Sequence, residues 1–426
     1  MHYTKAQRER LQLRIREVCD FLAMPPFYVR DRFGELSGES GLVATLGSDI
    51  EFRVTHNGKL LRPEKSKDHV NKLILSANKQ LARERLLWHW DKINEILQAP
   101  KETSREPVML DTVGIDGDRI ECRTHPALAP QSAQIIDETI RRFDEICQDH
   151  GCESEWTSGH LHISFKILKG VKIWDDEDNS SVYNPDTDVN TNNLFKAIIS
   201  GMIDFQETYP ALFLRPRNVE RNDAYGGYAG TEYLRYSEHG HCSASVIQKS
   251  HEDEIFDQIQ GLEARIAKIS ALHSIALYMT AIEHGIKNGG KSLLTGQPHR
   301  LMFGKKGEAP HRDDDMGHFE NTFRGKKGFL DLIKVTVQNL LHDHPDIKKS
   351  LSPDLQIDLI KAVCRDYRQY LDSTIGRKRY RGREVREIKR ELAEIEKKFT
   401  AEKALEADEI SEQAKFHTSM HPSCDS

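Results

Sequence analysis

The sequence predicts an α+β protein in which a mostly antiparallel sheet with flanking helices is followed by a helical C-terminal region. Between about residues 42 and 240, short runs alternate apolar and polar residues and are separated by turn signals, a pattern typical of strands that pair antiparallel. Two helical patterns interrupt these runs, and after about residue 250 the helical period dominates. Strands and helices in this order favour an α+β layer over a doubly wound sheet.

The composition is that of a soluble globular protein without a general affinity for polyanions. The chain has 426 residues, enough for two domains or one large domain with an appendage. Its formal net charge of −6 gives no attraction to nucleic acid or acidic membranes, so we expect neither partner. Seven scattered cysteines without a CxxC pair argue against a disulfide framework and fit a reducing cytosol. The N-terminal residues lack the apolar core of a signal peptide, and no stretch approaches the length of a membrane span, so we expect a cytoplasmic protein.

The first segment, residues 1–40, is predicted to contain one helix. Apolar residues recur at helical spacing among charged residues over 5–22. The Pro25-Pro26 pair ends this pattern, because proline cannot continue a helix. We expect an N-terminal helix that docks on the body of the protein.

The second segment, residues 41–250, contains the predicted sheet and two helices. Its strand and helix patterns follow in the order 43–54 (strand), 68–97 (helix), 108–124 (strands), a helix from Ser132, and 159–168 (strand). Turn signals such as Asp-Gly-Asp lie between the strands, which indicates hairpin connections.

The third segment, residues 251–406, is predicted to be helical. Ser250 precedes three acidic residues within four positions and is an N-cap signal for a helix. The Gly289-Gly290 pair is a stop signal for the helix that follows. Residues 329–343 form a further helical pattern with an apolar face.

A stripe of apolar residues at three- and four-residue steps predicts a terminal helix. The stripe consists of Val385, Ile388, Leu392, Ile395 and Phe399. Two heptads are too few for a free coiled coil, so we expect a helix packed on the body or a small contact that makes a homo-oligomer. Residues 407–426 are expected to be disordered.

Three of the predicted strands collect ionisable side chains on one face and apolar side chains on the other, because positions i and i+2 of a strand point the same way. The residues on the polar faces are Asp49, Glu51 and Arg53 on the first strand, Glu121 and Arg123 on the second, and His160, His162 and Ser164 on the third.

Such a face indicates a metal and phosphate site if the strands are neighbours. Carboxylates are hard ligands for Mg²⁺ or Mn²⁺, an imidazole suits Mn²⁺, and arginines bind phosphate or carboxylate groups. Alone, a pair of carboxylates such as Asp49 and Glu51 is usually a solvated strand face, and a pair such as His160 and His162 is as often a hydrogen-bonded surface pair as a ligand pair. Three such strands within about 120 residues favour a functional site, since buried charges must otherwise be paired.

The segments LGSDIEF, GIDGDRIECRTHPA and SGHLHIS, in this order, resemble the ATP-dependent carboxylate–amine ligases of the glutamine synthetase-like and gamma-glutamylcysteine ligase-like fold, in particular a phage-associated branch. The resemblance covers about residues 42–240, half of the chain. It implies a curved antiparallel sheet that carries the active site, so that 41–250 would be the catalytic domain.

The resemblance also implies roles for individual residues. The implied Mg²⁺ or Mn²⁺ ligands are Asp49, Glu51, Glu121, His160 and Glu232. The implied ATP-binding residues are His162, Ser164, Arg215 and Arg217, and the implied catalytic residues are Arg123, Arg221 and Arg235. Related ligases carry the last glutamate and arginine two positions apart, whereas Glu232 and Arg235 are three apart, so both reach one face only with a bulge.

The implied reaction joins a small-molecule or peptide carboxylate to an amine through an acyl phosphate, with ATP as the phosphoryl donor. Two alternatives use the same residues. A metal-dependent phosphoesterase or hydrolase would use the same carboxylates, and His162-Ile-Ser164 fits half of a two-histidine phosphoesterase, although a second matching strand is missing from the sequence. A non-catalytic interaction protein would keep the sheet only as a scaffold.

Overall fold

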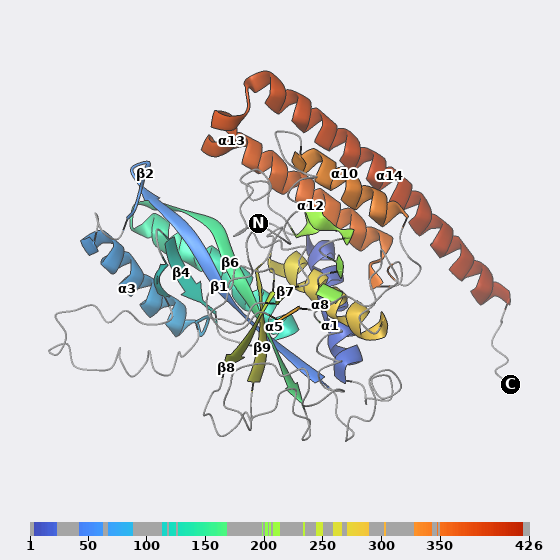
Figure 1. The fold of residues 1–426 in the computed structure, drawn as a ribbon, viewed down its shortest axis with the longest axis horizontal. Helices are drawn as coiled ribbons and strands as arrows, with labels where there is room; N and C mark the ends of the chain where they lie inside the picture. Colours follow the sequence, from blue (N-terminus) through green and yellow to red (C-terminus); the bar gives the residue numbers. More distant parts are fainter. Residues whose placement is uncertain are drawn as a thin grey trace.

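The computed structural model describes residues 4–23, 42–62, 67–87, 113–116, 119–124, 127–167, 198, 201–202, 204–205, 208–213, 233–234, 244–249, 259–265, 271–288, 302–303, 328–342, 347 and 350–420. These residues form a curled antiparallel sheet, helices that cover one of its faces, and a group of helices beside it (Figure 1). The predicted α+β class with a mostly antiparallel sheet is confirmed.

In the described part of the chain, eight strands form the main sheet: β1 (Leu42–His56), β2 (Lys59–Leu60), β3 (Val113–Asp116), β4 (Arg119–Arg123), β5 (Ala127–Leu128), β6 (Cys152–Ile167), β8 (Ala244–Lys249) and β9 (Ile259–Arg265). Their order is β3-β4-β1-β6-β9-β8, and β2 and β5 each pair with β1. All of these pairings are antiparallel. The three strands with the predicted polar faces, β4, β1 and β6, are therefore direct neighbours.

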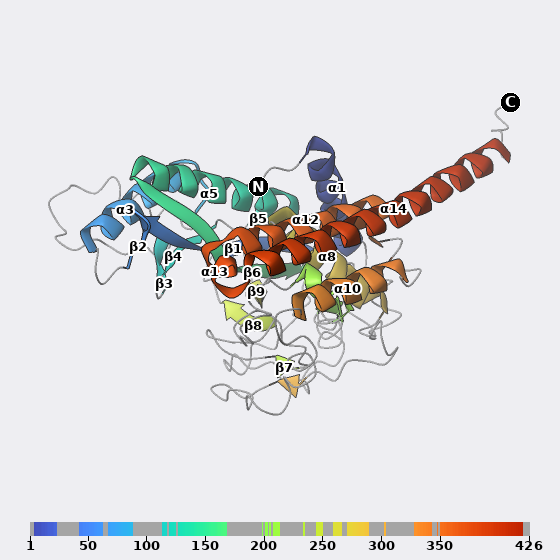
Figure 2. The same cartoon turned by 90° about the horizontal axis from the view of Figure 1, so that it is seen from above.

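Two helices, α3 (Lys67–Arg83) and α5 (Ala129–Asp149), lie on one side of the sheet (Figure 2). Phe52 of β1 stacks on Phe143 of α5 with ring centroids 4.2 Å apart, and both side chains are buried. Burying a phenylalanine contributes about 1.5–3 kcal/mol, so this contact fixes which face of β1 lies against the helix.

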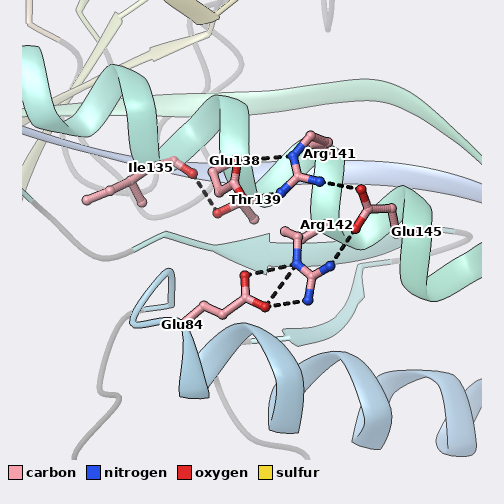
Figure 3. Close-up of polar contacts among 7 residues, drawn as sticks. All are labelled: Glu84, Ile135, Glu138, Thr139, Arg141, Arg142 and Glu145. Atoms are coloured by element: carbon pink, nitrogen blue, oxygen red, sulfur yellow. Dashed lines mark hydrogen bonds and ion pairs between the residues drawn. The ribbon is translucent and has the colours of Figure 1, made fainter.

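Ion pairs join the end of α3 to α5 on the outer surface (Figure 3). Arg142 Nε donates to both carboxylate oxygens of Glu84, at 2.9 Å each. Arg141 pairs with Glu138 and Glu145, one turn to either side of it on the same helix. The cluster is partly exposed, so its contribution to the stability of the fold is small.

The remaining helices of eight or more residues in the described part are α1 (Lys5–Ala23), α8 (Ala271–Asn288), α10 (Gly328–Leu341), α12 (Pro353–Asp372) and α14 (Gly382–Met420), with the short α13 (Thr374–Arg379) between the last two. α1 forms where the helical spacing predicts it and packs on α8 and on the sheet. α12 and α10 pack against α14, the long helix at the top of Figure 1. None of the described helices combines the length and the apolar character needed to cross a membrane.

The apolar stripe of α14 is buried within the chain. Ile388, Leu392 and Phe399 are inaccessible or nearly so, and Val385 and Ile395 pack against the same core. The sequence allowed two roles for this stripe, packing on the body of the protein or contact with a second copy. The stripe is buried within a single chain, as the first role requires.

Three sequence predictions differ from the structure. The helix expected over 68–97 ends at Arg83, because Arg85 has a φ of 56°, the left-handed conformation that stops helices. The helix expected after Ser250 is absent over 259–265, where β9 pairs with β6 and β8. This seven-residue segment mixes apolar and polar residues and is too short for its period to separate helix from strand, and pairing satisfies the backbone groups of the β6 edge.

The third difference lies at the C-terminal end. Disorder was expected from residue 407, but α14 continues to Met420. Residues 396–407, which lead into this segment, are rich in alanine, glutamate and lysine, which have high helix propensity. Pairs such as Lys398 with Glu402 add further support at i,i+4 spacing.

Candidate active site

The polar faces of β1 and β4 lie side by side, on the side of the sheet opposite to α5. On β4, Ile120 and Cys122 are buried while the residues that alternate with them are more exposed. The register places Glu51 directly opposite Glu121 and Asp49 directly opposite Arg123. The alternation read from the sequence therefore holds for these two strands, and it places three carboxylates on one face of the sheet.

Directly opposed carboxylates repel each other, and two arginines of β4 offset that repulsion. Arg119 donates from Nη1 to Oε2 of Glu51. Arg123 Nε donates to Glu121 Oε1 at 2.9 Å and lies 3.9 Å from Asp49 Oδ1. Each of the three carboxylates thus has a guanidinium cation beside it.

Exposure differs sharply between the anions and the cations of this cluster. The side chains of Glu51 and Glu121 are 5% and 13% exposed. Those of Arg119 and Arg123 are 33% and 44% exposed. The two glutamates are therefore the buried part of the cluster, and the guanidiniums are its more exposed part.

Arg119 is a site residue that the sequence reasoning missed. It follows an Asp-Gly-Asp turn signal and therefore reads as part of the turn. The signal that could have found it is its position two residues before Glu121, which places it on the same face of the strand. Arg53, the other arginine expected on the polar face, is half-buried and lies opposite Glu155 in the register.

Strand β6 contributes the histidine pair by register. His160 lies opposite Asp49 on one side and Arg265 of β9 on the other. His162 lies opposite Gly47 and Glu263. The side chains of His160, His162 and Ser164 are outside the described part, so their predicted roles stay predictions.

Gly159 allows β6 to approach β1 beside the site. Its φ is +154°, and a Cβ built there would lie 2.1 Å from the carbonyl oxygen of Asp49. The register between the two strands shifts next to this point, between Glu51 and Phe52. A residue with a side chain at 159 would push β1 away from β6 where the two strands carry Asp49 and His160.

Cys122 lies on the face opposite to the carboxylates and takes no part in their chemistry. Burial raises the pKa of its thiol well above the usual value, and the neighbouring Cys147 and Glu121 raise it further. A protonated, buried thiol is neither a nucleophile nor a metal ligand. Its contribution is to the apolar layer between β4 and α5.

Five of the predicted site residues fall outside the described residues: Arg215, Arg217, Arg221, Glu232 and Arg235. The two residues between the last pair form β7 (Tyr233–Leu234), which pairs in parallel with β10 (Met302–Phe303) as a separate two-stranded sheet. The expected glutamate–arginine strand is therefore not paired with β1, β4 or β6 over these two residues.

The donor set of the site suits a hard divalent cation, since carboxylate oxygens are the ligands that Mg²⁺ and Mn²⁺ prefer. Within the residues whose side chains are described, no three His, Cys, Asp or Glu side chains converge as metal ligands. Glu51 and Glu121 each accept a hydrogen bond from a guanidinium. The side chain of His160, another proposed ligand, is not among those described.

Comparisons with known proteins are distant. No family model matches the chain, and no curated protein is detectably similar to it. Among solved structures, the chain is similar to a novel glutamine synthase homologue, with a TM-score of 0.48 at 11% identity over 90% of this chain and 75% of that one. It is also similar to GmaS without ligand (TM-score 0.46, 12% identity, 86% and 76% covered) and to GmaS with ADP (0.44, 10%, 86% and 76%). Because these scores are low, we derive the function from the residues of the chain.

Proposed function

We propose that the protein is an ATP-dependent ligase that uses Mg²⁺ or Mn²⁺ to join a carboxylate to an amine through an acyl phosphate. One observation carries this proposal. Neighbouring strands place Glu51 opposite Glu121 and Asp49 opposite His160, with two arginines on the same face. These are the positions at which the sequence resembles carboxylate–amine ligases of the glutamine synthetase-like fold.

The carboxylates would hold the metal. Glu51, Glu121 and Asp49, with His160 from the adjacent strand, are the ligands in this proposal, and the bound ion would neutralise the phosphate oxygens of ATP. Burial of Glu51 and Glu121 strengthens their attraction for a cation, because water screens buried charges less than exposed ones.

The arginines would bind the anionic substrates. Arg123 is nearly half exposed and lies between Glu121 and Asp49, so its guanidinium can contact a phosphate or a substrate carboxylate above the site. Joining a carboxylate to an amine in water is unfavourable, so the carboxylate must first receive a phosphoryl group. Fixed positive charge beside the transferring phosphoryl group lowers the barrier to that transfer.

The test is ADP release in the presence of ATP, Mg²⁺, a panel of amino-acid and peptide carboxylates, and hydroxylamine as a small amine. We expect ADP release only when a carboxylate and an amine are both present. Glu51→Gln and Glu121→Gln should each lower the rate at least about 100-fold, as removal of a group that stabilises transition-state charge does. Glu138→Gln, on the outer surface of α5, is the matched control and should leave the rate unchanged.

Two results would contradict the proposal. ADP release that needs neither carboxylate nor amine would indicate a hydrolase on the same residues. Absence of Mg-ATP binding by calorimetry, together with Glu51→Gln and Glu121→Gln variants that behave as the unmodified chain does, would favour a non-catalytic interaction protein.

A further inference from the structure

The contact between Arg119 and Glu51 joins a buried anion to a partly exposed cation. Glu51 lies on β1, which pairs along its length with β4 on one side and β6 on the other. Its side chain is 5% exposed, whereas that of Arg119 is 33% exposed. A long, partly exposed arginine can rotate its guanidinium into water, and a buried glutamate on a central strand has no such freedom.

The charges of the cluster favour exchange of this arginine for a divalent cation. Asp49, Glu51 and Glu121 carry three negative charges, and Arg119 and Arg123 carry two positive charges, which leaves a net charge of −1 among these side chains. If a divalent cation replaces Arg119, the three negative charges lie beside three positive charges, one from Arg123 and two from the ion. The ion thus offsets more of the repulsion among the three carboxylates than the single charge of Arg119 does.

We propose that Arg119 acts as an exchangeable counter-cation, which neutralises Glu51 while no metal is bound and releases it when a divalent cation binds. The inference rests on the proposed metal site and adds a residue that controls metal affinity. It also explains why Glu51 and Glu121 bond to guanidiniums and why the described carboxylates do not converge as metal ligands.

Manganese binding to the full chain without nucleotide tests this role, with unbound Mn²⁺ measured by electron paramagnetic resonance. Arg119→Gln removes the competing charge and should tighten Mn²⁺ binding about 2- to 5-fold, the effect of losing one partly exposed ion pair. Arg119→Lys keeps the charge and should stay close to the unmodified chain. Arg141→Gln removes an arginine of similar ion pairing on α5 and is the control that should not change binding.

Glu51→Gln separates this inference from the proposed function. If Mn²⁺ binds and Glu51→Gln weakens that binding, the metal site stands. Within that case, unchanged or weaker Mn²⁺ binding in Arg119→Gln would overturn the exchange and would make Arg119 a residue that positions Glu51. If Mn²⁺ fails to bind the unmodified chain, the metal site and the exchange fail together.

A second measurement needs no variant and therefore does not depend on how Arg119→Gln folds. Phenylglyoxal modifies exposed guanidiniums, and peptide mass spectrometry reports the modification of each arginine. Saturating Mn²⁺ should increase the modification rate of Arg119 at least about twofold, since a released side chain is more exposed than one held in an ion pair. Arg141 should not change and serves as the internal control. Equal modification of Arg119 with and without Mn²⁺ would overturn the proposal.

Discussion

Two regions of the molecule place arginines against buried carboxylates, and they differ in the exposure of the arginine. In the helical region, Arg14 of α1 pairs with Glu283 of α8, and the two side chains are 8% and 5% exposed. In the sheet, Glu51 is equally buried, but its partner Arg119 is one-third exposed. The two glutamates are equally buried, whereas the two arginines differ about fourfold in exposure.

This difference separates an ion pair that holds the fold together from one that can exchange. Arg14 also donates from Nε to Thr280 at 3.0 Å, and Glu283 accepts from Lys287 at 2.6 Å, so the buried helical pair belongs to a larger polar network. Nearby, Arg10 and Gln7 of the same helix bond to Asp358 of α12. These contacts join α1, α8 and α12, and at 8% exposure the side chain of Arg14 has much less access to water than that of Arg119.

The largest effect should come from breaking the helical pair. Arg14→Met leaves Glu283 buried beside Lys287 alone and should lower the free energy of unfolding by about 3 kcal/mol, the low end for a broken buried pair because Lys287 remains. Urea unfolding measures the change. The double variant Arg14→Met/Glu283→Leu should recover most of the loss. A single variant as stable as the unmodified chain would remove the contrast between the two regions.

Acid should weaken the helical region through His273 of α8. Burial lowers the pKa of His273 from 6.5 to about 4, although Asp358 opposes the shift. The unfolded chain therefore binds a proton at a higher pH than the folded chain does. Stability should fall as pH drops from about 6.5 to about 4, by about 3 kcal/mol at most, and this contribution should change no further below that range. His273→Gln should lack this part of the slope in urea unfolding curves, and an unchanged slope would contradict the assignment.

A smaller effect is expected where β6 meets β1 in the sheet. Gly159→Ala forces a Cβ against the carbonyl of Asp49 and should lower the free energy of unfolding by about 1–3 kcal/mol, the range for overpacking. It should also weaken Mn²⁺ binding, because it displaces the strand that carries the carboxylates. Gly114→Ala on β3 is the matched control, since a Cβ there meets nothing within 4 Å. Equal stability and equal Mn²⁺ affinity in the two variants would show that the close approach has no role.

The smallest effect should come from the exposed cluster between α3 and α5. Arg142→Ala removes the contact to Glu84 and should change the free energy of unfolding by less than about 1 kcal/mol, because both side chains are partly exposed. High salt should reduce the difference further, as screening predicts. A loss as large as that of Arg14→Met would mean that exposure does not determine how much each ion pair contributes to stability.

Much of the sheet was predictable because local patterns agree with the tertiary structure. The alternation on β1 and β4 identified which residues lie on the polar face, and burial of Ile50, Phe52 and Ile120 follows the same pattern. Helix α1 was predictable for a similar reason, because its apolar stripe has one period and one clear stop.

The register and the long-range pairings were not predictable from one sequence. That Glu51 faces Glu121 depends on how the strands align, which alternation alone does not fix. Arg119 was missed because a turn signal precedes it, and β9 because seven mixed residues are too short for their period to separate a helix from a strand. In each case the partner strand decides the outcome, and that partner is distant in sequence.

A crystal structure of the protein with Mn²⁺ and a non-hydrolysable ATP analogue tests the central claim most directly. Anomalous density for manganese identifies the position of the metal without regard to the reaction. The account predicts a peak between the carboxylates of Glu51 and Glu121, with the phosphates of the analogue beside it and the guanidinium of Arg119 turned away from Glu51. Manganese bound elsewhere, with Arg119 still paired to Glu51, would contradict the account.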